Sequence, residues 1–234
     1  MINLIYSPQW FYGKDIFIDI ISLIVLALIS FFAFKYYKFN KEKKNHIYLC
    51  ISFGLISLSF LFKIMTNFSL YSIERHTAII GALAFTYNQI HYTNTLFLGG
   101  TLIYRLLTIV GLFSLYLLYY PKQRKSSILL LSYFILVTVY FTQFAFYPFH
   151  ITAFLLLILL AWHCYQNYRV TKDRPALLIF SSFSIIALSQ ILAVFLMMTK
   201  TFYVVSEIVQ LIGYSLLLFA FLMVLYYGTK KNKN

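Results

Sequence analysis

The sequence has few charged residues: they make up 11% of its 234 positions, and only six are Asp or Glu. Soluble domains are about 25% charged. Cysteine is also scarce, with two copies, whereas secreted disulfide scaffolds are dense in it. Hydrophobic residues make up 62% of the chain, more than one soluble core of this length can bury. The composition therefore excludes a soluble globular enzyme, a disordered chain and a disulfide-rich secreted domain.

Long apolar runs fill most of the chain, and a helix needs about 20 mostly apolar residues to cross the hydrocarbon of a bilayer. The runs lack the two-residue alternation of barrel strands. A backbone exposed to lipid must also satisfy its own hydrogen bonds, which favours helices. The sequence therefore predicts an all-α, polytopic membrane protein, one domain of seven transmembrane helices. The predicted spans are 16–34, 47–65, 96–119, 128–146, 149–166, 176–198 and 203–227.

Basic residues gather at alternate links between the spans. The clusters lie at 35–44, 122–125, 169–174 and 230–233, while the other links are nearly neutral. The positive-inside rule then places the N-terminus outside and the C-terminus in the cytoplasm of a multi-pass plasma-membrane protein. The net charge of +13 is accounted for by this orientation, without nucleic acid. The predicted partners of the basic face are the lipid bilayer and its anionic headgroups.

The outer link between the second and third spans is the longest, covering 66–95. Within it, 77–85 is apolar but too short to cross the membrane. The sequence therefore predicts a re-entrant or interfacial helix that lies over the mouth of the bundle.

Polar residues inside the spans are the main functional candidates, because they are expensive in lipid. Arg105 lies nine residues into the third span, about 13 Å deep for a rise of about 1.5 Å per residue. A buried guanidinium favours a carboxylate partner, so we expect Arg105 to pair with Glu207, with Asp19 or with both. The pair would either line a polar pocket open to the outside or fix helix order. The predicted intramembrane cluster comprises Arg105, Glu207, Gln210, Gln190, Asp19 and Tyr214.

Two lysines lie near the outer ends of spans, Lys63 in the second and Lys200 after the sixth. Such side chains usually extend their ammonium groups to the interface, and we interpret both in this way. A retinal Schiff base would need a lysine near the middle of the last span, and 203–227 contains none.

Three histidines and one glutamate on the outer side are weak candidates for a metal site. They are His76, His91, His150 and Glu74. Imidazole and carboxylate suit zinc or copper, but the spacing matches no known ligand motif. We therefore predict interfacial histidines, with no metal and no cofactor. Paired acids and a nucleophile with its base are also missing, so the sequence predicts no catalytic residue and no enzyme.

Several short segments carry a resemblance that extends over the whole chain. They are FKIMTN at 62–67, YRL at 104–106, SQIL at 189–192, YVVSE at 203–207 and QLIGY at 210–214. The chain resembles a set of uncharacterised seven-helix integral membrane proteins of small-genome archaea. The resemblance implies an archaeal plasma membrane and carries over no catalytic residue.

Three functions remain open from the sequence. The first is a sensor or ligand-binding bundle, with a polar pocket in its outer half and inner loops that contact a protein partner. The second is a structural or assembly subunit of a membrane complex. The third is a small transporter, which would need a polar path through an inner half that is nearly free of charge.

Overall fold

The architecture was analysed in a computed structural model of the chain. It describes the backbone of residues 8–11, 13–39, 45–71, 74–80, 83–89, 94–119, 125–142 and 147–231. Two short 3-10 segments, η1 (Gln9–Phe11) and η2 (Phe195–Met197), accompany the helices and strands described below.

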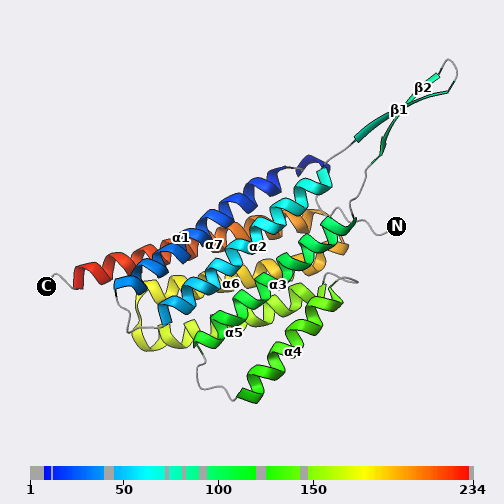
Figure 1. Cartoon of the computed structure of the whole chain (residues 1–234). Coiled ribbons are helices and arrows are strands. Elements are labelled where there is room, and N and C mark those ends of the chain that lie inside the picture. Colours follow the sequence, from blue (N-terminus) through cyan, green and yellow to red (C-terminus); the bar gives the residue numbers. More distant parts are fainter. Residues whose placement is uncertain are drawn as a thin grey trace.

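Six long apolar helices form an elongated bundle (Figure 1). Each contains a stretch long and apolar enough to cross a bilayer, so the chain is a multi-pass helical membrane protein. This confirms six of the predicted spans. The helices are α1 (Lys14–Phe39), α2 (Asn45–Tyr71), α3 (Asn94–Tyr119), α5 (Tyr147–Thr171), α6 (Arg174–Val194) and α7 (Thr201–Lys231).

The remaining predicted span, 128–146, contains a shorter helix, α4 (Lys125–Phe141). Its apolar part within the described residues is too short to count as a membrane span, and 143–146 of the predicted span lie outside the described residues. Ile135 and Val139 of α4 are buried on one narrow face of the helix, whereas Leu129 and Leu136 are exposed. α4 lies at the margin and diverges from the other helices (Figure 1). A seven-helix bundle therefore stays a prediction.

A β-hairpin occupies the long link between α2 and α3. Strands β1 (Glu74–Ile80) and β2 (Leu83–Gln89) pair antiparallel, with Glu74 opposite Gln89. The hairpin projects from the end of the bundle where α2 ends and α3 begins (Figure 1). The prediction of an interfacial helix at 77–85 is therefore wrong. The segment is rich in the β-branched and aromatic residues that favour strands, and an apolar run this short does not distinguish strand from helix.

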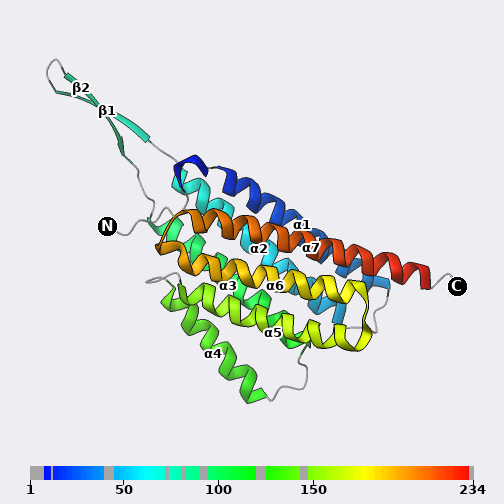
Figure 2. The same cartoon turned by 180° about the vertical axis from the view of Figure 1, so that it is seen from behind.

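The helices pack in a closed order that brings the ends of the chain together. α1 contacts both α2 and α7, α2 contacts α3, α3 contacts α5, and α6 lies between α5 and α7. Figure 2 shows α1 beside α7 on the face away from α4. The core between them is apolar, with Leu26, Ile29, Phe60, Ile109 and Leu160 almost fully buried. Residues on the first and last helices can therefore share one site.

Candidate functional site

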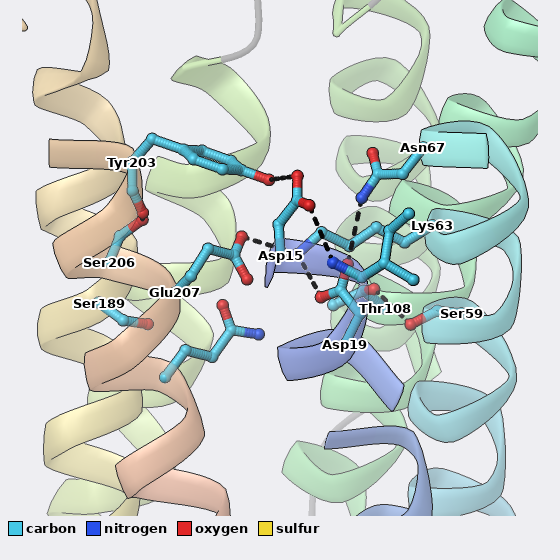
Figure 3. A network of polar contacts seen from close by, with 12 residues as sticks. Asp15, Asp19, Ser59, Lys63, Asn67, Thr108, Ser189, Tyr203, Ser206 and Glu207 are labelled. Atoms are coloured by element: carbon cyan, nitrogen blue, oxygen red, sulfur yellow. Dashed lines mark hydrogen bonds and ion pairs between the residues drawn. The ribbon is translucent and has the colours of Figure 1, made fainter. Parts of the chain in front are cut away.

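Three helices meet around one buried lysine near the end of the bundle that carries the hairpin (Figures 1 and 3). Each helix contributes two residues four positions apart, which places them on one helical face. We call this group the Lys63 cluster. It consists of Asp15 and Asp19 from α1, Lys63 and Asn67 from α2, and Tyr203 and Glu207 from α7.

Lys63 bridges two carboxylates from different helices. Its Nζ lies 2.7 Å from Oδ1 of Asp19 and 2.7 Å from Oε1 of Glu207. The side chains are almost removed from solvent, with exposed fractions of 12% for Lys63, 0% for Asp19 and 8% for Glu207. The ammonium group also lies 5.5 Å from the ring centre of Phe60 and 5.9 Å from that of Tyr104, within cation–π range. One ammonium group thus joins α1, α2 and α7.

The remaining polar atoms of the cluster form a hydrogen-bonded shell around this bridge. Asn67 donates to Oδ2 of Asp19 over 3.3 Å, and the Tyr203 hydroxyl donates to Oδ2 of Asp15 over 3.4 Å (Figure 3). Within the described part of the chain, every buried side-chain nitrogen and oxygen has a hydrogen-bond partner. In their ionised forms, Asp19 and Glu207 together carry two negative charges against the one positive charge of Lys63.

Lys63 was predicted to reach the interface, and this interpretation is wrong. α2 continues to Tyr71, so Lys63 lies about 12 Å before the end of the helix for a rise of about 1.5 Å per residue. The predicted end of the span near residue 65 made it look terminal. The sequence did contain a signal, because the carboxylates of Asp19 and Glu207 at similar depth need a cation.

Arg105 has a different neighbourhood from the predicted one. Its Nη1 donates to the carbonyl oxygen of Thr142 over 2.5 Å, and its guanidinium carbon lies 5.8 Å from the ring centre of Phe149. The predicted pairing with Asp19 or Glu207 is replaced by the pairing of both with Lys63. The physical reason is helix order, since α3 packs against α2, α4 and α5 rather than beside α1 or α7.

The other predicted residues surround a small internal cavity next to the cluster. Gln210 donates to the Tyr214 hydroxyl over 3.4 Å, and the Gln190 side-chain oxygen lies 2.9 Å from Nδ1 of His150. Gln190, Gln210 and Tyr214 line the cavity with Tyr104, and its volume is about 20 Å³. This space admits about one water molecule. The predicted cluster is thus divided into a charged group with Asp19 and Glu207 and a neutral amide–phenol group, and Arg105 lies in neither.

Of the four weak metal candidates, the structure describes the side chain of His150 alone. His150 lies in α5 and contacts Gln190, whereas Glu74 and His76 lie in β1 without described side chains. His91 falls outside the described residues. Among the side chains that are described, no three His, Cys, Asp or Glu residues are grouped as metal ligands.

Comparison with known proteins gives no family for this chain. No protein-family model matches it, and comparisons with curated proteins and with solved structures also give no match. The resemblance to archaeal seven-helix proteins therefore stays a prediction, and function has to be argued from the Lys63 cluster.

Proposed function

We propose that the chain is a membrane sensor whose binding site is the Lys63 cluster and whose ligand is the proton. The observation that carries the proposal is the double bridge from Lys63 to Asp19 and Glu207, buried and shared by three helices. Ionisable groups at such depth are costly and are retained where they function. A group that joins three helices through two ion pairs also couples them, because loss of either pair removes one ionic link between helices.

The charge balance supports a cationic ligand. Asp19 and Glu207 share the single ammonium group of Lys63, and buried carboxylates need protons or cations to compensate them. The neighbouring cavity of about 20 Å³ has room for water but not for an organic ligand. A proton needs no additional space. When a proton binds Asp19, Lys63 loses one of its two charged partners, and α1 loses its ionic link through Lys63 to α7.

The groups around the bridge come from every helix that packs on it. α1 supplies Asp15, α7 supplies Tyr203, and α3 supplies Tyr104, whose ring lies 5.9 Å from the Lys63 ammonium. Arg105 of α3 donates to the Thr142 carbonyl oxygen, and His150 of α5 contacts Gln190. The proposed proton uptake therefore depends on Asp19, the fully buried carboxylate that Lys63 bridges to Glu207.

Transport is supported less well than sensing. Passage of a solute requires polar groups that continue towards the opposite end of the bundle. There the buried hydroxyls of Ser52 and Ser182 donate to carbonyl oxygens of their own helices, those of Tyr48 and Leu178. In an assembly subunit, the Lys63 cluster would hold the three helices together without taking up a proton. The pH titration described below therefore distinguishes an assembly subunit from a sensor.

Orientation is part of the proposal, because the proton has to reach the cluster from outside the cell. The exposed basic residues Arg169, Lys172 and Arg174 lie at the end of α5 and the start of α6, away from the cluster, and favour a cytoplasmic position. We expect a membrane-impermeant thiol reagent to label Lys200→Cys but not Lys172→Cys on intact cells, with Cys50 and Cys164 replaced by serine. Labelling of Lys172→Cys alone would reverse the orientation.

Proton uptake is testable through Trp10, which lies beside the cluster. Its ring centre is 5.5 Å from that of Phe11, which lies 6.4 Å from that of Tyr203. In a Trp162→Phe background, we expect the Trp10 emission to follow a single transition as the pH is lowered from neutral. Asp19→Asn should abolish the transition, because Glu207 alone then balances the ammonium group of Lys63.

The matched control is Asp173→Asn, which removes an exposed carboxylate at the opposite end of the bundle. This variant should keep the transition. Two results would contradict proton sensing: the absence of any transition in the Trp162→Phe protein, or an unchanged transition in Asp19→Asn. The second result would assign the signal to another group, such as a histidine.

A further inference from the structure

An open apolar groove runs along the outside of the bundle between α1 and α2. Its volume is about 410 Å³, within the range of sites that hold small molecules. The groove is separate from the Lys63 cluster, and none of the cluster residues lines it. Its wall is formed by Ala27, Phe31 and Phe34 of α1 and by Gly54, Leu58 and Leu61 of α2.

The groove is apolar and faces outward. Phe31, Phe34, Leu58 and Leu61 have exposed fractions between 42% and 60%, so they border an opening rather than a closed core. The hydroxyl groups along it are already used: Ser30 donates to the Cys50 carbonyl oxygen and Ser57 to that of Leu23. A molecule in the groove therefore needs no polar groups to satisfy these hydroxyls, so a hydrocarbon chain fits it.

At one end of the groove, two lysines of α1 lie next to the wall that α1 forms. Ala27, Phe31, Phe34 and Lys38 follow one another at spacings of four, three and four residues, so they form one helical row. Lys35 lies four residues after Phe31, and both lysines are exposed. Lys38 lies about 6 Å beyond Phe34 for a rise of about 1.5 Å per residue. An anionic group attached to a chain in the groove would reach both.

We propose that this groove and its two lysines form a binding site for one phospholipid with an anionic headgroup. An acyl chain fills the space between α1 and α2, and the phosphate meets Lys35 and Lys38. Charge argues against a second copy of this chain as the occupant. Two copies of the exposed pair Lys35 and Lys38 would repel each other across a symmetric interface.

The test is native mass spectrometry of the delipidated protein in a non-ionic detergent, with added phosphatidylglycerol or phosphatidylcholine. We expect the protein to retain one phosphatidylglycerol in preference to phosphatidylcholine, with a preference of about fivefold for each lysine near the headgroup. Lys35→Ala with Lys38→Ala should remove the preference for the anionic lipid. Ala27→Trp, which fills the groove, should reduce retention of both lipids.

Matched controls separate a specific site from general attraction. Arg169→Ala with Lys172→Ala removes the same charge from exposed positions at the same end of the bundle and should keep the preference. Val205→Trp adds the same side chain at an exposed position of α7 and should keep retention. The proposal is overturned if Lys35→Ala with Lys38→Ala retains phosphatidylglycerol like the unchanged protein. A dimer that Ala27→Trp dissociates, without loss of bound lipid, would also overturn it and assign the groove to a second copy.

Discussion

Replacing Lys63 with methionine is expected to destabilise the protein by about 3–5 kcal/mol, the usual cost of removing one partner from a buried ion pair. The reason lies in what the substitution leaves behind. Asp19 is fully buried and Glu207 nearly so, and both would lose the ammonium group 2.7 Å away. Methionine fills much of the same space, so the loss would reflect uncompensated charge rather than a cavity. Unfolding in detergent micelles, followed by circular dichroism, measures the effect.

A compensated variant distinguishes charge from packing. Lys63→Met combined with Asp19→Asn and Glu207→Gln leaves no formal charge in the bridge, and we expect it to recover most of the lost stability. Lys200→Met is the single-site control, because Lys200 is exposed at the same end of the bundle. Equal losses for Lys63→Met and Lys200→Met would show that the bridge contributes little. A combined variant as unstable as Lys63→Met would show that the aromatic contacts of Lys63 matter more than its charge.

The carboxylates of this site were predicted from the sequence, whereas their cation was assigned to Arg105 and is Lys63. Asp19 and Glu207 lie well inside apolar runs, where an ionisable group is costly and therefore indicates a functional or structural site. Lys63 lies where α2 appeared to end, and a lysine at a helix end ordinarily reaches water. Arg105 was predicted to pair with these carboxylates because it lies deeper in its apolar run than Lys63. The depth of a residue along its helix does not determine which helix it faces. The closed order that brings α1 beside α7 is a tertiary property that periodicity does not encode.

The same distinction applies to the fold. Six helices followed from the length of their apolar runs alone, since crossing a bilayer sets a minimum length. The link between α2 and α3 gave no such constraint. An apolar segment of nine residues at 77–85 fits a short helix or a hairpin equally well, and the hairpin is the outcome. For α4, the described helix stops at Phe141, before the predicted end at 146.

Close contact between α2 and α3 depends on Gly111, and Gly111→Leu is expected to cost about 3 kcal/mol, at the upper end of the range for overpacking. A Cβ atom at this position would lie 2.5 Å from Cγ1 of Ile56 and 3.0 Å from the carbonyl oxygen of Ser52. The second contact is with backbone, which cannot rotate away. The two helices would therefore have to separate. Small residues at contacts between membrane helices allow the backbones to approach this closely.

Gly99 provides the matched control on the same helix. A Cβ atom at Gly99 would meet nothing within 4 Å, so Gly99→Leu should change stability by less than about 1 kcal/mol. Separation of α2 from α3 at Gly111 would also strain the hydrogen bond between Thr108 and Ser59, which are 2.9 Å apart in the same interface. If Gly111→Leu and Gly99→Leu unfold at the same detergent concentration, α2 and α3 do not depend on this approach. If only Gly111→Leu is destabilised, the α2–α3 contact contributes to stability independently of the ion pairs that Lys63 makes from the same helix.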